Sequence, residues 1–261
     1  MNPIIPEWPA PDCVKAFSTV RAGGFSLAPY HGNAAGTGGL NLGLHVGDDP
    51  VTVLKNRDLL RKRLPSEPVW LNQVHGSDIV DAGKVTGVPD ADASFTLQKD
   101  TVCVIMTADC LPVLLCTADG AAVAAVHAGW RGLVGGVLEN AVGILGKKGG
   151  SGIMAWLGPA IGPAVFEVGE DVRKAFLHKD RKFSAAFQER KDAKGKYLAD
   201  IYELARGTLN KAGVSRVYGG DFCTVTDSGR FYSYRRDKVT GRMATGIWIA
   251  SRKDQLFFCN K

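Results

Sequence analysis

The sequence predicts a globular α/β or α+β protein in which helices cover mixed β-sheets. Short runs of β-branched and apolar residues, typical of strands, alternate along the chain with stretches that carry apolar residues at helical spacing. The strand-like runs are continuously apolar rather than alternating, which is typical of sheets buried on both faces. Helices between them would provide that cover.

Four helices are predicted from capping residues and apolar spacing. They are expected at residues 50–60, 133–145, 171–178 and 197–211. Asp49 before Pro50 has the form of an N-cap followed by proline at the first helical position. Gly149 or Gly150 is expected near the end of the second helix, and Gly213 ends the fourth.

Six strands and one long loop are predicted between these helices. The strands are expected at residues 69–71, 101–106, 112–116, 122–126, 153–157 and 246–250. Residues 22–44 are rich in glycine and lack charged side chains, so they are predicted to form an ordered loop. Long loops in compact domains often carry function, which makes Arg21, His31 and His45 candidate site residues.

Composition excludes several classes of protein. With 261 residues, 45% hydrophobic and 22% charged, the chain is neither disordered nor collagen-like, and a single domain over residues 1–261 is expected. The net charge of +6 arises from scattered basic residues, without the basic and aromatic stripe of a nucleic-acid-binding protein. A mildly basic surface suits small anionic substrates such as phosphate.

Membrane insertion, secretion and a disulfide framework are not expected either. The longest apolar stretch, residues 151–166, is interrupted by glycine and proline and is shorter than the roughly 20 residues of a membrane helix. The first residues lack a basic segment followed by an apolar run, and the six cysteines form no CxxC pair. We therefore expect a cytoplasmic monomer with free or metal-bound thiols.

Two histidines and a cysteine stand at the ends of predicted strands. His75, Cys110 and His127 together offer the nitrogen and sulfur donors that zinc and copper accept. Their spacing matches no compact metal signature. The same residues could instead place a Cys110 nucleophile beside His127 or His75, with Asp109 or Asn72 as the orienting group, and the spacing leaves both alternatives open.

Candidate anion-binding residues lie elsewhere in the chain. Arg131 stands at the start of the second predicted helix, where its guanidinium and free backbone N–H groups could hold phosphate. Arg21 before two glycines, and the YRRD string that begins at Tyr234, are weaker candidates. No GxGxxG or P-loop string follows a predicted strand, so the common nucleotide fingerprints are absent.

Several ordered strings together resemble the YfiH-type laccase-domain family. They are NLGLHVGDD at 41–49, NQVHG at 72–76, ADCLP at 108–112, HAGWRG at 127–132 and YRRD at 234–237. The resemblance extends from about Arg21 to Ile249, nearly the whole chain. It implies a layered α/β/β/α fold with mixed sheets, similar to the catalytic domain of cytotoxic necrotizing factors.

The resemblance also implies a metal site and a chemistry. The metal ligands would be His75, Cys110 and His127, and the family is associated with phosphorolysis of purine nucleosides, deamination of adenosine and cleavage of methylthioadenosine. Some members are implicated in correcting peptidoglycan precursors. A complete multicopper laccase centre needs about ten histidines, whereas this chain has five, so oxidase activity would need a single metal ion.

The leading expectation is therefore a zinc-dependent enzyme in which phosphate attacks C1′ of adenosine, inosine or methylthioadenosine. For deamination, zinc would activate the water that attacks C6 of adenine, with Asp109 as acid and base. Arg131, Arg21 or His45 would hold phosphate. The alternatives are a cysteine-dependent amidase with Cys110 as nucleophile, a single-copper polyphenol oxidase, and a protein whose metal site is structural.

Overall fold

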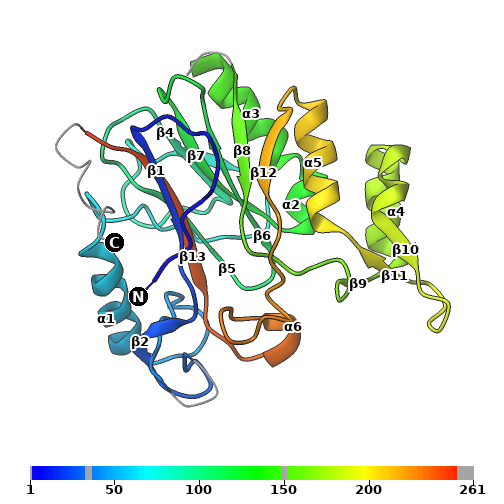
Figure 1. Ribbon diagram of the computed structural model, residues 1–261, viewed down its shortest axis with the longest axis horizontal. Coiled ribbons are helices and arrows are strands. Elements are labelled where there is room, and N and C mark those ends of the chain that lie inside the picture. Colours follow the sequence, from blue (N-terminus) through cyan, green and yellow to red (C-terminus); the bar gives the residue numbers. More distant parts are fainter. Residues whose placement is uncertain (1, 33–36, 149–151, 252–261) are drawn as a thin grey trace.

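The central feature of the fold is a mixed sheet of six strands (Figure 1). The computed structural model describes residues 2–32, 37–148 and 152–251. In spatial order the strands are β12 (Arg216–Gly219), β8 (Met154–Leu157), β6 (Leu111–Cys116), β7 (Val123–Ala128), β4 (Ala93–Thr96) and β3 (Ile79–Asp81). The pairs β12–β8 and β3–β4 are parallel and the other neighbours are antiparallel. The prediction of mixed sheets is therefore confirmed.

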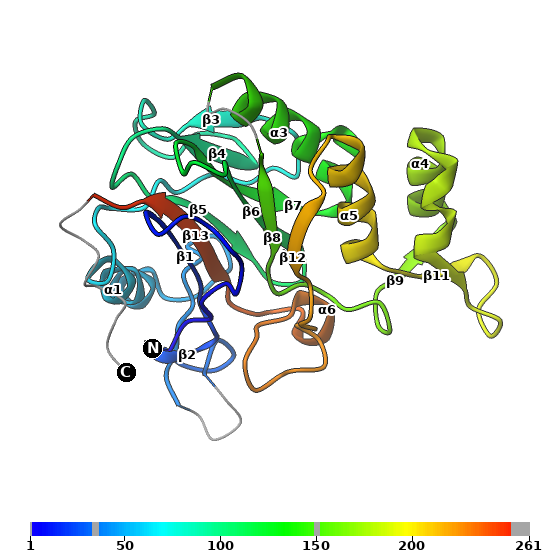
Figure 2. The ribbon, with the colours of Figure 1, turned by 45° about the horizontal axis from the view of Figure 1, so that its top comes forward.

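A second, antiparallel sheet packs against the first. Its strands are β1 (Val14–Ser18), β13 (Met243–Ile249) and β5 (Cys103–Thr107). A small third sheet, made of β10 (Phe187–Glu189), β11 (Lys196–Ala199) and β9 (Glu167–Gly169), lies beside α4 (Glu170–Lys179). Figure 2 shows this third sheet and α4 at the opposite end of the molecule from α1 (Pro50–Arg61).

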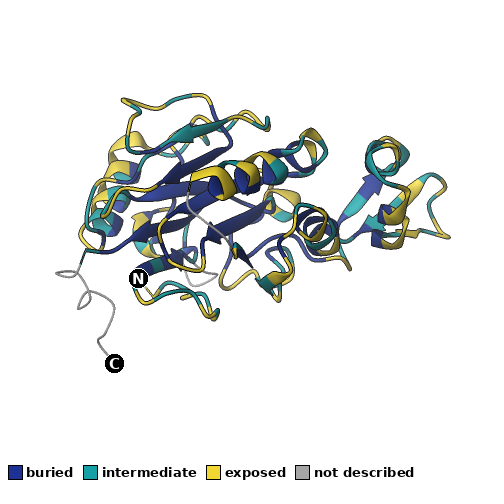
Figure 3. Ribbon diagram, turned by 90° about the horizontal axis from the view of Figure 1, so that it is seen from above, coloured by how far each residue is buried: buried dark blue, intermediate teal, exposed yellow. Residues whose placement is uncertain are grey.

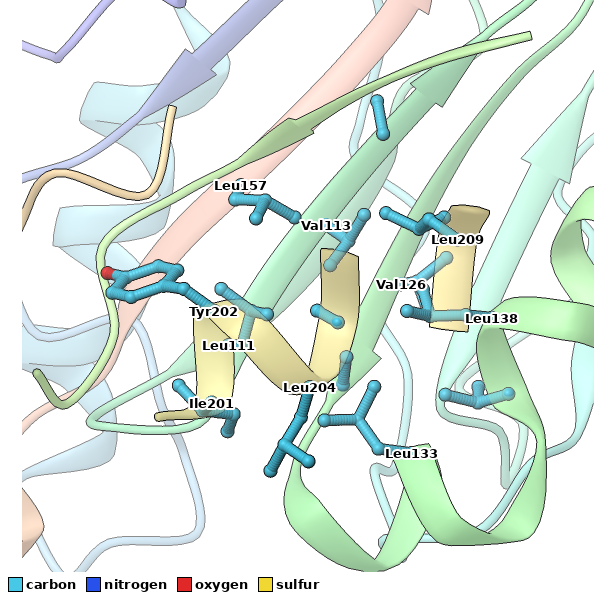
Figure 4. Close-up of a cluster of buried hydrophobic side chains, with 14 of the residues drawn as sticks. Leu111, Val113, Val126, Leu133, Leu138, Leu157, Ile201, Tyr202, Leu204 and Leu209 are labelled. Carbon is cyan, nitrogen blue, oxygen red and sulfur yellow. The ribbon is translucent and has the colours of Figure 1, made fainter. Parts of the chain in front are cut away.

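The direction of alternate side chains in the strands explains the layers. In β6, Val113 and Leu115 pack under helices, whereas Leu114 and Cys116 on the other face pack against the second sheet. Helices α3 (Val137–Lys148) and α5 (Ile201–Lys211) cover the outer face of the large sheet (Figure 4). Leu60 of α1 packs on the outer face of the second sheet. The order of layers is thus α/β/β/α, and the strands are buried between helices with exposed outer faces (Figure 3).

The helix predictions are confirmed at two positions and corrected at two. Helix α1 begins as predicted, with the Asp49 carboxylate accepting a hydrogen bond from the Thr52 N–H, and α4 agrees with its predicted range. The second predicted helix is two helices, α2 (Trp130–Gly135) and α3, because Gly136 between them adopts a left-handed conformation with φ 91°. Its predicted end at Gly149 or Gly150 lies outside the described residues.

The fourth predicted helix starts too early. Residues 196–199 form β11, and the Asp200 carboxylate caps α5 by accepting from the Tyr202 and Glu203 N–H groups. Two short helical segments were not predicted, a 3-10 helix at Arg181–Ala186 and α6 at Tyr234–Asp237. Within the described ranges, no helix is both long and apolar enough to cross a membrane.

Five of the six predicted strands are present with slightly shifted ends, and the prediction at residues 69–71 is wrong. Val69 makes only an isolated bridge to Cys103. The predicted loop at 22–44 begins with a strand, β2 (Ala22–Ser26), whose ends bridge to Gly39, while residues 33–36 lie outside the description. Strands β1, β3, β4 and β9 to β12 were not predicted, because each is short and lacks a long apolar run.

Asp200→Ala is expected to lower the free energy of unfolding by about 1 kcal/mol, because it leaves two N–H groups of the first turn of α5 without their acceptor. The change is measured by urea unfolding. Asp192→Ala is a suitable control, since that exposed carboxylate caps no helix. Equal loss of stability in both variants would contradict the capping role.

Candidate metal centre and substrate pocket

Three donor side chains meet at one end of the large sheet. Cys110 directly precedes β6 and His127 lies near the end of β7, and the pairing of Leu111 with Ala128 brings them together. His75 comes from the loop at residues 72–76, and its Nε2 lies 4.0 Å from Cys110 Sγ. One nitrogen or sulfur atom from each residue lies within 4.8 Å of the others. The structure thus brings together the three predicted ligands.

Asp92 holds two of these ligands in place. Its buried carboxylate lies 2.7 Å from Nδ1 of His127, which leaves Nε2 of that ring free to face the cluster. The same carboxylate accepts hydrogen bonds from the N–H groups of Val74 (3.2 Å), His75 (3.0 Å) and Gly76 (2.6 Å). Burial alone would raise the pKa of Asp92, but the bonds from His127 and Gly76 outweigh it and lower that pKa.

The backbone around the ligands is strained. His75 has φ 61° and Asp109, next to Cys110, has φ 91°, a region that side chains with a Cβ rarely adopt. Backbone of this kind persists where surrounding contacts fix it, and it is frequent at functional sites. The hydrogen bonds of Asp92 provide such contacts for His75.

The electrostatics of the cluster favour a thiolate. Burial alone would raise the pKa of the Cys110 thiol, but the charge of His127 and hydrogen bonds to His127 and His75 lower it to about 6. For His127, burial acts to lower the pKa, but the charge of Cys110 and the bond to Asp92 raise it to about 9. A thiolate is the form of cysteine that binds a metal ion or acts as a nucleophile.

A glycine leaves space beside the three donors. A Cβ on Gly129 would lie 3.2 Å from Cys110 Sγ, 3.4 Å from His75 Cδ2 and 3.7 Å from His127 Nε2. Two imidazoles and a thiolate with such a space beside them fit a zinc or copper ion, which these donors bind at about 2.0–2.3 Å. The residues present therefore fit the metal ion that the family resemblance implies.

Gly129→Ala is expected to weaken metal binding about tenfold without unfolding the chain, because ligand distances tolerate only about 0.2 Å of displacement. The backbone at Gly129 (φ −62°, ψ 161°) is open to any residue, so the effect is steric. Competition with a chromophoric chelator measures the affinity. Gly143→Ala on α3, where an added Cβ meets nothing within 4 Å, is the control; equal affinity in the two variants would contradict the steric reading.

The donors open into a pocket of about 380 Å³, a size that suits a small-molecule ligand. Its lining residues are His45, Gln73, His75, Met106, Thr107, Ala108, Cys110, His127, Tyr234 and Arg242. Gln73 fixes one wall, since its side-chain amide exchanges hydrogen bonds with the backbone N–H (2.7 Å) and carbonyl (2.8 Å) of Met106. The pocket thus combines the donor cluster with a rigid polar wall.

Arg242 is the only lysine or arginine among the pocket-lining residues, and the sequence analysis missed it. Its Nη1 donates to the carbonyl oxygens of Thr240 and Gly241, and among the described residues no hydrogen bond engages its Nε or Nη2. Burial lowers the pKa of Arg242, and the pKa of His45 is lowered by desolvation and by the charges of Arg242 and Arg57. Away from the donor cluster, the pocket therefore offers the guanidinium of Arg242 and the imidazole of His45, whose lowered pKa favours its neutral form.

Two of the predicted anion-binding arginines do not line this pocket. Arg21 is buried, donates to the carbonyls of His31 and Ser228, and lies over the Tyr232 ring. Arg131 is exposed and stacks on the Trp130 ring beside it. Of the three predicted phosphate-binding residues, the structure places only His45 in the pocket wall.

Asp109 also lies behind the pocket lining. Its carboxylate accepts a hydrogen bond from the Thr224 hydroxyl (2.6 Å) and another from the Arg235 N–H (2.6 Å). These bonds engage both of its oxygen atoms, which is a structural arrangement rather than that of an acid or base facing a substrate. Neither Asp109 nor Asn72 orients His127. The carboxylate of Asp92 lies against the His127 ring, and the Asn72 side chain donates to Asp90 instead.

Comparison with known proteins identifies the family and agrees with the fold. The profile of a family described as multi-copper polyphenol oxidoreductase laccase matches residues 15–250. The purine nucleoside phosphorylase YfiH of Shigella flexneri is 54% identical over 252 residues, covering 94% of this chain and 98% of the relative. A purine nucleoside phosphorylase of Pseudomonas aeruginosa is 49% identical over 246 residues, with coverage of 94% and 98%.

Solved structures share the fold over nearly the whole chain. The crystal structure of a Neisseria meningitidis protein matches with a TM-score of 0.87 and 45% identity, covering 96% of this chain and 100% of that one. A Bacillus licheniformis YfiH protein matches with a TM-score of 0.80 and 28% identity, covering 90% and 92%. The family profile, the relatives and the layered fold all lead to one conclusion: the chain belongs to the YfiH-type laccase-domain family.

Proposed function

We propose that this protein is an enzyme that cleaves purine nucleosides by phosphorolysis, giving the free base and ribose 1-phosphate. The names of its relatives support the reaction, since proteins 54% and 49% identical are purine nucleoside phosphorylases. The observation that carries the proposal is the pocket, where a His–Cys–His donor cluster and one arginine line the same space. Adenosine, inosine and methylthioadenosine are the proposed substrates.

Arg242 is the residue that we assign to phosphate. Phosphate carries one to two negative charges at pH 7, and a guanidinium with free N–H groups binds it in a planar, two-point geometry. In the reaction a phosphate oxygen forms a bond to C1′ while the bond from C1′ to N9 breaks and the purine leaves with a proton. Arg242 would hold the attacking group, and the neutral ring of His45 can exchange a proton or hydrogen bond beside it.

His75, Cys110 and His127 would hold the metal ion, which we propose is zinc. When bound, the ion supplies a Lewis acid at the pocket floor. The protein's part is to keep the three donors at fixed positions, through Asp92 on two of them and through the space at Gly129. The same donors accept copper. Deamination of adenosine is proposed as a second activity of this site.

A cysteine-dependent hydrolase, acting on peptidoglycan precursors, is the second candidate function. The observation in its favour is that Asp92, His127 and Cys110 stand in the order of orienting group, base and nucleophile. In that case Cys110 would attack a carbonyl carbon, and His127 would pass the thiol proton to the leaving amine. Metal-free protein would retain this activity.

The test is incubation of the purified protein with adenosine or inosine, with and without phosphate, followed by chromatography of bases and nucleosides. The expected result is free base only in the presence of phosphate, with loss after chelation and recovery after zinc is added. Inosine formed from adenosine in both tubes would establish deamination. Base release without phosphate, or activity that survives chelation, would contradict metal-dependent phosphorolysis.

A further inference from the structure

Helix α6 contributes to the wall of the substrate pocket. The roles proposed for the metal ligands and Arg242 do not explain this part of the wall. It spans only Tyr234–Asp237 and buries none of its own residues. Tyr234 nevertheless lines the pocket, and the residue is 54% exposed. Lys238 Nζ lies over one face of the Tyr234 ring, 5.8 Å from its centroid. Since the residue is half-exposed, the other face of the ring is open to a ligand in the pocket.

The short helix is held by a buried carboxylate that adjoins a metal ligand. Asp109 directly precedes Cys110 in the chain, and its Oδ2 accepts from the N–H of Arg235 at 2.6 Å. Its Oδ1 accepts from the hydroxyl of Thr224 at 2.6 Å. Because Asp109 is only 9% exposed, these charge-assisted bonds are shielded from water and fix α6 relative to Cys110.

A second set of hydrogen bonds fixes α6 to the segment that contains Thr224. The Arg236 Nη1 donates to the carbonyl oxygens of Thr224 (2.8 Å) and Val225 (2.9 Å), and the Ser233 hydroxyl caps α6 by accepting from the Arg236 N–H. Thr224 is thus bound on one side to Asp109 and on the other to α6. A helix of four residues has little stability of its own, so its position depends on these contacts.

We propose that Tyr234 is the platform on which the purine base stacks, and that Asp109 is a positioning residue that sets the distance between this platform and the metal ligands. The proposal rests on the proposed function for its substrate. A planar base is the part of a nucleoside that an aromatic face recognises, whereas Arg242 suits the phosphate. Asp109 would act through α6 without touching the reacting atoms.

Tyr234→Leu tests the platform. It is expected to raise KM for inosine and adenosine about tenfold with kcat within about threefold, because one factor of ten corresponds to the energy of a typical base stack. Tyr234→Phe keeps the ring and should restore KM. Phe25→Leu, at a ring that is 51% exposed on β2 and does not line the pocket, is the matched control. An unchanged KM in Tyr234→Leu would overturn the proposal.

Thr224→Val tests the positioning role of Asp109, since it removes one bond to that carboxylate without altering the pocket lining. We expect KM to rise about threefold to tenfold with an unchanged pH profile, and Thr224→Ser to restore it. A fall in kcat with a shifted pH profile and constant KM would overturn the positioning role in favour of acid–base chemistry.

Binding of inosine without phosphate, measured by calorimetry on the zinc-loaded protein, separates failure of the inference from failure of the proposed function. If wild type binds inosine but does not cleave it, phosphorolysis is wrong, and weaker binding by Tyr234→Leu still supports the platform. If wild type cleaves nucleosides and Tyr234→Leu binds them equally well, phosphorolysis stands and the platform is wrong. If wild type neither binds nor cleaves them, both are wrong.

Discussion

Replacing Cys110 with serine is expected to weaken metal binding more than about a hundredfold and to lower nucleoside phosphorolysis about a thousandfold. A serine hydroxyl stays protonated at neutral pH and is a poor ligand, whereas the Cys110 thiolate is favoured by its two histidine neighbours. The several kcal/mol that a bound Lewis acid supplies correspond to about three factors of ten in rate. Metal content by mass spectrometry and base release by chromatography measure the two effects.

Cys223→Ser is the control for this substitution. Cys223 is another partly exposed thiol, and its Sγ accepts a hydrogen bond from the Gly162 N–H that a serine oxygen can also accept. It should keep both metal and activity. Metal retained at the wild-type level in Cys110→Ser, with activity lost, would contradict the role of Cys110 as a ligand and favour the cysteine hydrolase.

The sequence predicts strands and helices more accurately where the apolar pattern is strong than where a segment is short and mixed. Strand β6 is a run of buried residues, so its existence and its burial on both faces follow from composition alone. Strands such as β11 are short and carry mixed residues, and they were merged with the helix that follows because Leu198 falls at helical spacing with Ile201. Here the capping carboxylate of Asp200 was the better signal, since it marks where a helix begins.

The sequence pointed to His75, Cys110 and His127 because the strings that contain them resemble those of the family, whereas their spacing alone left a metal site and a nucleophile as alternatives. The arginine that lines the pocket could not be singled out from the sequence, because arginine is common and its role depends on position. Arg131 beside a helix start and Arg21 before glycines had local reasons to bind anions, yet both are held elsewhere by Trp130 and by backbone carbonyls. Arg242 has no such local signal and reaches the pocket only through the fold.

Asp92, which supports two of the three donors, also could not be predicted from the sequence. It stands before β4, a strand that was not predicted, and nothing in its neighbourhood in the sequence connects it with His75 or His127. Only the pairing of β4 with β7 brings its carboxylate to the imidazole of His127. Supporting residues of this kind are set by topology, which explains why the sequence pointed to the three donor residues and not to Asp92.

Asp92→Ala is accordingly expected to have an effect on both stability and metal binding. Removing the carboxylate leaves three N–H groups and Nδ1 of His127 without an acceptor, which should lower the free energy of unfolding by about 3 kcal/mol. Metal affinity should fall about 10- to 100-fold, since the His127 ring loses the bond that fixes its orientation. Urea unfolding and competition with a chelator measure the two changes.

The two effects of Asp92 arise from different bonds and can be separated. In the chelator-treated protein the loss of stability should persist, because the N–H groups of the His75 loop need an acceptor whether or not a metal ion is bound. Asp90→Ala is the matched control: that carboxylate is exposed and accepts one bond, from Asn72, so it should change stability by less than about 1 kcal/mol and leave metal affinity unaltered. If Asp92→Ala loses metal affinity but keeps the stability of the metal-free wild type, then Asp92 acts through the His127 ring alone, and the His75 loop is held by other contacts.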